Sequence, residues 1–241
     1  MSSYKKEIGT AVQNFAGDPA NPLTGQLWYD SDASEFKYQE QVTGNAWSTG
    51  NSMNTARSQL AGAGTQTAAL GFGGTTPPVS ALTEQYNGTS WTEVADLNTA
   101  RRLIAGTGTQ TSSLAFGGHA PSVTAATESW NGSSWTEVAD LNTARVALAA
   151  AGADNTSALA FGGLNPPTFY ANTESWNGSS WTEVNDLNTA RRDLGGNGII
   201  TSALAYGGDT PGATAATESW NGTSWTDVAD LNTARRLAGA G

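Results

Sequence analysis

Tryptophans that recur in pairs are the first side chains of this sequence whose type and spacing could do chemistry. One tryptophan recurs at Trp47, Trp91, Trp135, Trp181 and Trp225, at intervals of 44 to 46 residues, and the last three of these are each preceded by a second tryptophan, at Trp130, Trp176 and Trp220. Such indoles could stack on sugar rings, or they could pack between repeated structural units, where each would bury roughly 150–250 Å². Repetition in one register favours packing, and a sugar site built on Trp135, Trp181 and Trp225 would occur several times in the chain.

Arginines recur with the same period and form the second candidate set. Arg101, Arg145 and Arg191 each end an Asn-Thr-Ala-Arg tetrapeptide, and each is followed by a glutamate in the next repeat. A ring of these arginines could bind an anion. The alternative, which we favour, is that each arginine ties a turn to a neighbouring carboxylate, an interaction worth about 0–1 kcal/mol when it is exposed.

Residues that would support catalysis or metal binding are scarce. The chain has no cysteine and a single histidine, His119, and it lacks the phosphate-loop, HExxH and Gly-x-Ser-x-Gly motifs. The acidic run Asp30–Glu35 begins like a calcium loop, but Glu35 stands where the loop requires glycine. We therefore expect no enzyme activity, no cofactor and no metal, with His119 a loop residue and Asp30–Glu35 a polar turn.

Composition narrows the classes of partner. The 241 residues carry a formal net charge of −10, and a field of that sign repels nucleic-acid backbones. No apolar run approaches the ~18 residues of a membrane-spanning helix. The first residues have no apolar core of a secretory signal. The sequence predicts neither nucleic-acid binding nor membrane insertion.

The repeat itself indicates the architecture. An aromatic-Gly-Gly element recurs at Phe72, Phe116, Phe161 and Tyr206, and a period of ~40–50 residues is typical of propeller blades. Within one repeat we expect four strands, at residues 102–108, 112–118, 126–130 and 133–138. We call them A to D. The third and fourth are joined at Asn-Gly, a type I′ hairpin signal, and the Gly- and Ala-rich first strand is expected to be innermost.

The ends of the chain predict the number of blades. Residues 235–241 read as a first strand with nothing after it, and residues 24–56 read as the other three strands, since Trp28 precedes Trp47 by the spacing that separates Phe116 from Trp135. We therefore predict an all-β, five-bladed propeller over 24–241, preceded by an N-terminal arm of residues 1–23. One blade would be closed by 24–56 with 235–241, and the remaining repeats would span 57–100, 101–144, 145–190 and 191–234.

The aromatic-Gly-Gly element, the late tryptophan and the closing Leu-x-x-x-Arg resemble kelch repeats over about residues 24–241. The segment "ESWNGTSWTDVADLNTAR", residues 218–235, resembles repeats in virion structural proteins of marine bacteriophages. Residues 21–39 resemble segments near the N-termini of phage tail and fibre proteins. This resemblance implies a non-enzymatic component of the tail or capsid surface, located in the virion. It implies other virion subunits as partners within an oligomeric assembly, and a host-surface glycan as a further ligand.

We expect specific contacts with a partner or ligand in the loops whose sequences differ between repeats. The loops between the second and third strands share one face with the turns between repeats, and they differ in every repeat. One of them carries His119, and the longest carries Phe169 and Tyr170, which suit contact with protein or sugar. The function that we expect is a virion structural or adhesion protein. The alternative is a lectin-like propeller with repeated sugar sites between its blades.

Overall fold

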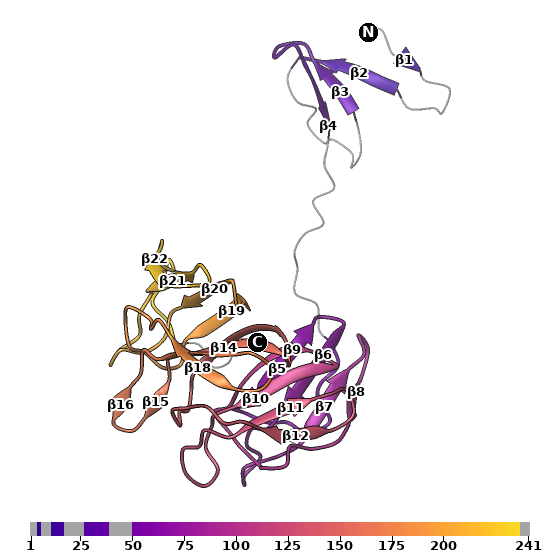
Figure 1. The fold of residues 1–241 in the computed structure, drawn as a ribbon. Helices are drawn as coiled ribbons and strands as arrows, with labels where there is room; N and C mark the ends of the chain where they lie inside the picture. The colour runs from indigo at the N-terminus through magenta and orange to yellow at the C-terminus, as the bar shows by residue number, and fades with distance from the viewer. Residues whose placement is uncertain (1–3, 6–10, 17–26, 39–49, 237–241) are drawn as a thin grey trace. The chain divides into compact units, whose positions relative to one another are not determined.

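The computed structural model describes residues 4–5, 11–16, 27–38 and 50–236. The chain divides into two compact units, Met1–Thr49 and Gly50–Gly241. All regular secondary structure in the described residues is β-strand (Figure 1), which confirms the all-β class.

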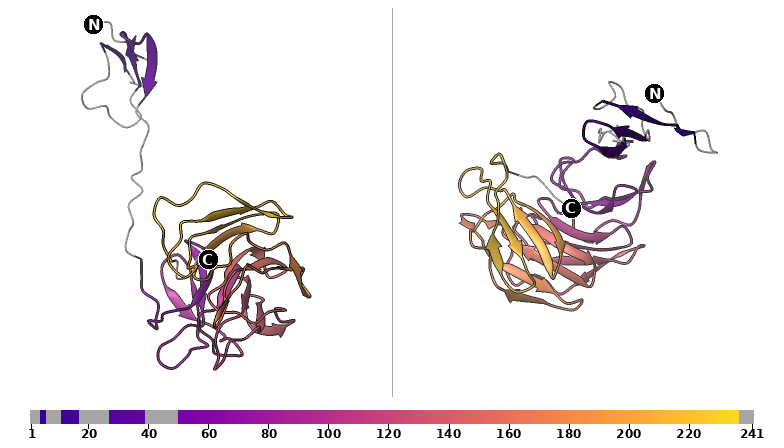
Figure 2. Two further views of the ribbon diagram at one scale, coloured as in Figure 1. Left: turned by 90° about the vertical axis from the view of Figure 1, so that its left-hand side faces the viewer. Right: turned by 90° about the horizontal axis from the view of Figure 1, so that it is seen from above.

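The larger unit consists of four antiparallel sheets of four strands each, arranged as propeller blades (Figures 1 and 2). Blade 1 is formed by β5 (Ala61–Thr65), β6 (Ala68–Phe72), β7 (Thr83–Tyr86) and β8 (Trp91–Glu93). Blade 2 is formed by β9 (Ala105–Thr109), β10 (Ser112–Phe116), β11 (Thr127–Trp130) and β12 (Trp135–Val138).

Blades 3 and 4 repeat this order, with one insertion. Blade 3 is formed by β13 (Ala149–Asp154), β14 (Ser157–Phe161), β17 (Thr173–Trp176) and β18 (Trp181–Val184). Its loop between β14 and β17 contains the short hairpin of β15 (Leu164–Asn165) and β16 (Thr168–Phe169). Blade 4 is formed by β19 (Gly195–Ile199), β20 (Ser202–Tyr206), β21 (Thr217–Trp220) and β22 (Trp225–Asp227).

The first strand of each blade is the innermost, as its small residues predict. Strand β5 packs on β9, β9 on β13, and β13 on β19. The close approach explains the glycines: a Cβ atom at Gly106 would lie 2.3 Å from Cζ of Phe72 in the preceding blade. An aromatic ring from one blade thus fills the space that the inner strand of the next blade leaves open.

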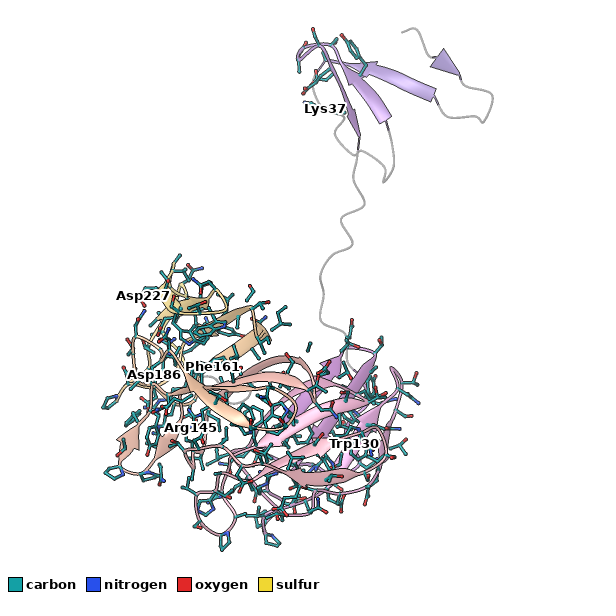
Figure 3. All side chains as sticks on the ribbon, viewed as in Figure 1. Lys37, Trp130, Arg145, Phe161, Asp186 and Asp227 are labelled. Atoms are coloured by element: carbon teal, nitrogen blue, oxygen red, sulfur yellow. The ribbon has the colours of Figure 1, made fainter. Side chains whose placement is uncertain are left out.

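Neighbouring blades are joined by one aromatic contact that recurs three times. The ring centroids of Phe72 and Trp135 lie 4.9 Å apart. The pairs Phe116–Trp181 and Phe161–Trp225 have the same separation of 4.9 Å. Figure 3 labels Phe161 within the larger unit.

Each of these indoles also makes a buried hydrogen bond across the blade boundary. Nε1 of Trp135 donates to Oγ1 of Thr83 at 3.1 Å, and the bonds from Trp181 to Thr127 and from Trp225 to Thr173 measure 3.1 and 3.0 Å. Since a buried donor must be satisfied, this bond fixes how far one blade is rotated against the next.

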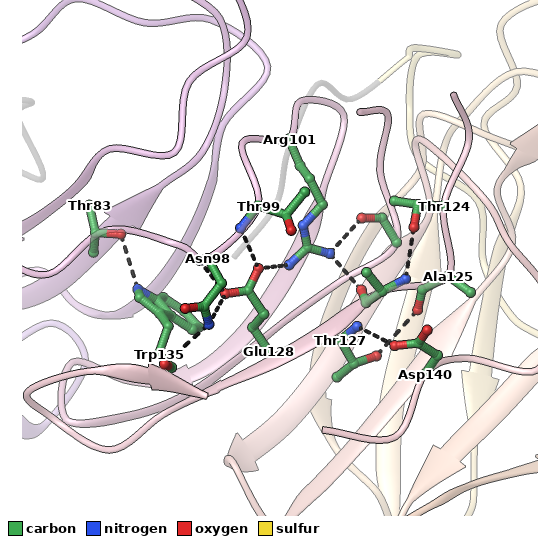
Figure 4. A network of polar contacts seen from close by, with 12 residues as sticks. Thr83, Asn98, Thr99, Arg101, Thr124, Ala125, Thr127, Glu128, Trp135 and Asp140 are labelled. Carbon is green, nitrogen blue, oxygen red and sulfur yellow. Dashed lines mark hydrogen bonds and ion pairs between the residues drawn. The ribbon is translucent and has the colours of Figure 1, made fainter. Parts of the chain in front are cut away.

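The Asn-Thr-Ala-Arg tetrapeptide forms a clamp between blades (Figure 4). The carbonyl of Arg101 accepts the amide of Gly74 in blade 1 at 2.8 Å. Its guanidinium meets Glu128 in blade 2 at 2.8 Å and donates to the carbonyl of Gly117 at 2.9 Å. The amide of Asn98 donates to the second oxygen of Glu128 at 2.7 Å. The clamp therefore holds one blade by its backbone and the next by its side chains.

The ion pair of this clamp recurs at every repeat, and it is buried. The ion pairs are Arg57–Glu84 (3.0 Å), Arg101–Glu128 (2.8 Å), Arg145–Glu174 (2.8 Å) and Arg191–Glu218 (3.1 Å). In the last one Nη1 of Arg191 has no hydrogen-bond partner among the described residues, and Nη2 donates to the carbonyl of Ala205. Arg101, Arg145 and Arg191 are 0% exposed. Burial lowers the pKa of Arg145, and the adjacent Glu174 acts in the opposite direction. Each arginine thus ties its turn to a neighbouring carboxylate, as predicted. The pairs are out of water, so the small value that holds for exposed pairs does not apply to them.

The hairpins between the third and fourth strands differ from the predicted type I′ turn. Gly132 has φ 94°, but Asn131 does not have a positive φ. Instead Oδ1 of Asn131 accepts the amides of Ser133 and Ser134 at 2.9 and 3.0 Å. Asn-Gly marks a hairpin here because the asparagine side chain replaces a backbone acceptor and only the glycine needs the left-handed region.

The blade count of five is corrected to four. The strands predicted for the fifth blade are β3 (Leu27–Asp30) and β4 (Glu35–Tyr38), which form an antiparallel hairpin in the smaller unit. On its other edge β3 pairs in parallel with β2 (Ala11–Phe15), in the position where residues 235–241 were expected. Residues 39–49 and 237–241, which would supply the rest of that blade, lie outside the described residues.

The division of the chain differs from the predicted one for the same reason. The residues expected to form an arm contribute β1 (Tyr4–Lys5) and β2 to the sheet β1-β2-β3-β4, so the unit boundary falls at Thr49 and not at residue 23. Parallel pairing of β2 with β3 links segments that no repeat relates, and the spacing of tryptophans carries no information about it.

The repeated contacts stop at the two outer blades. Leu204 in blade 4 is 40% exposed, whereas its equivalents Leu70, Leu114 and Leu159 are 1%, 0% and 1% exposed. The difference measures what a following blade contributes, because the four side chains occupy the same strand position.

Removing one partner of a clamp should cost about 3–5 kcal/mol, because an uncompensated charge would stay buried. We expect Arg101→Met to lower the free energy of unfolding by this amount in denaturant titration. The neighbouring Arg102→Met is the control, since the Arg102 side chain is only partly buried. Equal unfolding of the two variants would contradict a stabilising clamp.

Replacing Thr127 by valine should leave the indole N–H of Trp181 without an acceptor and cost about 1–3 kcal/mol. Thr217→Val is a matched control. Oγ1 of each threonine contacts a carbonyl two residues earlier, at 3.4 and 3.3 Å, but no tryptophan among the described residues donates to Thr217. The expected result is a lower melting temperature for Thr127→Val than for Thr217→Val, and identical melting would refute the role of the bond.

Candidate functional site

One end of the larger unit carries all the loops in which the blades differ. We call this end the variable face and define it by four pairs of bridged residues, one pair per blade: Ser58 and Thr75, Arg102 and His119, Val146 and Leu164, and Arg192 and Asp209. The bridges join the turn that enters each blade to the loop after its second strand, as strand alternation predicts. The bridged pair is therefore made of two hydroxyl residues in blade 1, two basic residues in blade 2, two aliphatic residues in blade 3 and an arginine with an aspartate in blade 4.

A chain of backbone hydrogen bonds crosses the blades at this face. Gln59, Leu103, Ala147 and Asp193 have positive φ values of 59°, 51°, 53° and 50°. The amide of each later residue donates to the carbonyl of the one before it in this series, at 3.0, 3.1 and 2.9 Å. The side chains just after each clamp arginine are therefore held in fixed positions, at the cost of a conformation that non-glycine residues seldom adopt.

His119 lies on the variable face in blade 2. Its backbone pairs with Arg102, and Nη1 of Arg102 reaches Oε1 of Gln59 in blade 1 at 3.3 Å. Nδ1 of His119 and Nε of Arg102 are buried without a hydrogen-bond partner among the described residues. His119 is thus a loop residue, next to a cation and not next to a nucleophile.

Phe169 lies at the boundary between blades 3 and 4 on the same face. The guanidinium of Arg192 stacks on its ring, with Cζ 5.5 Å from the centroid. Nε and Nη2 of Arg192 both donate to Oδ2 of Asp209, at 3.1 and 3.0 Å. Tyr170 contributes its backbone, which accepts the amide of Arg191 at 3.1 Å. This loop was identified from its greater length. Arg192 and Asp209 were not predicted from the sequence, because both stand at positions that belong to the repeat.

Two aspartates of this cluster are shifted in opposite directions. The pKa of Asp209 is lowered, first by the hydrogen bond from the amide of Gly212 and then by Arg192 and Arg236. The pKa of Asp193 is raised by burial, which outweighs the nearby Arg192. One carboxylate is thus stabilised as an anion, and the other is held in a place that disfavours its charge.

The repeated candidate residues lie inside the blades. Trp135, Trp181 and Trp225 are 5–6% exposed, and each packs at a steep angle against a phenylalanine of the preceding blade. Arg101, Arg145 and Arg191 are buried in the clamps. Among the predicted site residues, the structure brings only His119, Phe169 and Tyr170 to the variable face.

The described part of the larger unit has a hollow of about 400 Å³ at blades 1 and 2, lined mainly by apolar residues such as Leu60, Ala61 and Ile104. Two further hollows carry polar side chains. A cavity of about 150 Å³ lies among the four inner strands, lined by glycines and alanines with Thr107 and Asn197. A second hollow of about 430 Å³ lies between the outer strands of blades 3 and 4 and is lined by Glu183, Asn185 and Trp220, among others. The cavity among the inner strands offers only the side chains of Thr107 and Asn197 beside glycine and alanine, whereas the hollow between blades 3 and 4 combines a carboxylate and an amide.

Polar clusters elsewhere have local roles. Oδ1 of Asp30 accepts the amides of Asp32 and Ala33 at 3.0 and 3.2 Å, and Oδ2 lies 2.8 Å from Nζ of Lys37. The acidic run is therefore a polar turn between β3 and β4. Within the described ranges no group of three or more His, Cys, Asp and Glu side chains is placed to hold a metal ion.

No helix in the part of the chain that the structure describes is long and apolar enough to cross a membrane. Comparison with models of known protein families and with curated protein sequences finds no match.

Acid titration should separate the two aspartates. The lowered pKa of Asp209 means that its stabilisation is present above the ordinary value of about 3.9 and is lost as pH falls. The raised pKa of Asp193 means that its ionisation costs stability as pH rises through the raised value. At about pH 7 we expect Asp209→Asn to lower the melting temperature and Asp193→Asn to raise it, with both differences shrinking near pH 3. Differences of one sign would contradict this assignment.

Proposed function

We propose that this chain is a non-enzymatic structural or adhesion component of a bacteriophage particle, which presents a propeller for contact with protein or with the host surface. The observation that carries the proposal is the contrast within one scaffold: clamps and aromatic contacts repeat from blade to blade, whereas the side chains of the variable face do not. A surface that differs at every repeat, on a scaffold that does not, suits specific recognition.

The chemistry of the variable face supports contact and not catalysis. Phe169 and Arg192 form a stacked pair, and aromatic and arginine side chains are enriched at protein interfaces. Arg192 and Arg236 share Asp209, so charge is paired in advance and a partner need not order it. A general acid or base would need a titratable group free to exchange a proton with a ligand, and these groups are already engaged with each other.

The virion assignment rests on the resemblance of the repeat and of residues 21–39 to phage proteins, and the kelch-like description rests on the aromatic-Gly-Gly element and the late tryptophan. In this proposal the protein works in the particle, at its tail or capsid surface, with other virion subunits as neighbours. Acidic net charge suits this setting, since it keeps the exposed surface from adhering to nucleic acid released nearby.

A lectin-like propeller is the second candidate function. The hollow between blades 3 and 4 favours it, because carboxylate and amide groups are those that bind sugar hydroxyls. The buried tryptophan pairs do not add to this candidate, since their rings are covered by protein.

Two measurements test the first proposal. Antibodies raised against the chain should label tails or capsids in phage particles concentrated from seawater, viewed by electron microscopy. Purified protein should sediment with envelopes from a panel of marine bacteria, or bind isolated virions, and Phe169→Ala should weaken the binding about tenfold or more. Ser179→Ala, in a hairpin at the opposite end of blade 3, is the control. Unlabelled particles and no binding to either probe would overturn the proposal.

A further inference from the structure

Blade 3 differs from the other blades at two positions that both lie near its outer strand. Asn185 stands where the repeats carry Ala95, Ala139 and Ala229, and Asn172 stands where they carry Leu82, Ala126 and Ala216. Alanine at these positions evidently suits the fold. Asn185 has an asparagine counterpart in Asn51, before blade 1, so it is the combination of the two amides that is particular to blade 3.

The two amides converge on one carboxylate and one hairpin. Nδ2 of Asn172 donates to Oε1 of Glu183, and Nδ2 of Asn185 donates to the carbonyl of Thr223 in blade 4 at 2.8 Å. Glu183 recurs as Glu93 and Glu137 in the earlier blades, but among the described residues only Glu183 has such an amide partner. The carboxylate is thus held in place where it reaches the surface.

Glu183, Asn185 and Thr223 line the hollow of about 430 Å³ between blades 3 and 4, together with Val184, Trp220 and Gly222. Asn172 lies outside this lining and acts on the hollow through its bond to Glu183. Glu183, Asn185 and Thr223 are exposed there. The volume falls within the range of about 300–1,000 Å³ that small-molecule sites occupy. A carboxylate accepts hydrogen bonds, and an amide donates and accepts them. Trp220 is only 3% exposed, so the polar groups are the ones that a ligand would meet.

The structure assigns this hollow, which we call the blade 3–4 site, as a single binding site for a neutral sugar residue. Sugar hydroxyls both donate and accept, so a carboxylate beside an amide matches neighbouring hydroxyls. The sugar is neutral because no basic side chain lines the hollow and Glu183, within a chain of net charge −10, would repel an anion. The inference deepens the lectin-like candidate, and it replaces repeated sites by one.

The effect of Asn185 on stability can be measured separately, at an equivalent asparagine outside the blade 3–4 site. Asn51 occupies the equivalent position before blade 1, and its Nδ2 contacts the carbonyl of Thr89 at 2.5 Å as Asn185 contacts Thr223. The amide therefore also links neighbouring blades. Asn51→Ala removes such a link without touching the blade 3–4 site, so stability effects and ligand effects can be separated.

The experiment is titration of the full chain with glucose, galactose, mannose, N-acetylglucosamine, N-acetylgalactosamine and fucose, each to about 10 mM, followed by calorimetry and saturation-transfer NMR. We expect one of these sugars to bind with one site per chain. Asn185→Ala and Asn172→Ala should each weaken it roughly tenfold, with melting temperatures that change no more than that of Asn51→Ala. Placing asparagine at both equivalent positions of blade 2, Ala126→Asn with Ala139→Asn, should create a second, weaker site.

Several outcomes would overturn the inference. Absence of binding by all six sugars would do so, as would binding that survives Asn185→Ala combined with Asn172→Ala, or several equal sites per chain. Binding to envelopes or virions without any of these sugars would remove the blade 3–4 site and leave the proposed function intact. Sugar binding by a chain whose antibodies label no phage particle would keep the blade 3–4 site and contradict the proposed role in the virion.

Discussion

The buried clamp is the interaction on which the rest of the larger unit depends. Blades contact one another through inner strands of glycine and alanine, which supply little specific side-chain packing. Arg145 meets Glu174 at 2.8 Å and donates to the carbonyl of Gly162 at 2.9 Å, so it orients the blade it enters through directional bonds. A buried ion pair seldom adds net stability over apolar packing. Its value here lies in angle and register, which small apolar side chains cannot specify.

Because the clamp recurs between blades, the side chains of the variable face are not needed to hold the blades in position. Once the clamp and the Phe–Trp contact set the position of each blade, the side chains after the arginine and after the Gly-Gly element need only hold their bridges, which are made by backbone atoms. That is why Ser58, Arg102, Val146 and Arg192 can occupy equivalent places. Diversity at this face costs the fold little, and recognition can be built there.

Sequence reasoning predicted the parts of this structure that are local and repeated. Strand order, the innermost strand and the indole packing follow from period and alternation. Burial of Arg101 could not be predicted in the same way, because a charged residue reads as a surface residue unless its partner is known to lie in the same interior. The blade count failed for a related reason: pairing of β2 with β3 is non-local, and the sequence Leu27–Asp30 fits both a propeller strand and this sheet.

The candidate sites were predictable where the sequence departs from its own repeat. The greater length of one loop pointed to Phe169 and Tyr170. Their neighbours Arg192 and Asp209 occupy repeat positions, so neither loop length nor an insertion distinguishes them in the sequence. Asn172 and Asn185 each differ from their counterparts in the three other blades, although Asn51 matches Asn185. In a repeat protein the other copies state which residue the fold accepts at each position, so a departure that also lines a hollow separates the needs of a ligand from the needs of the scaffold.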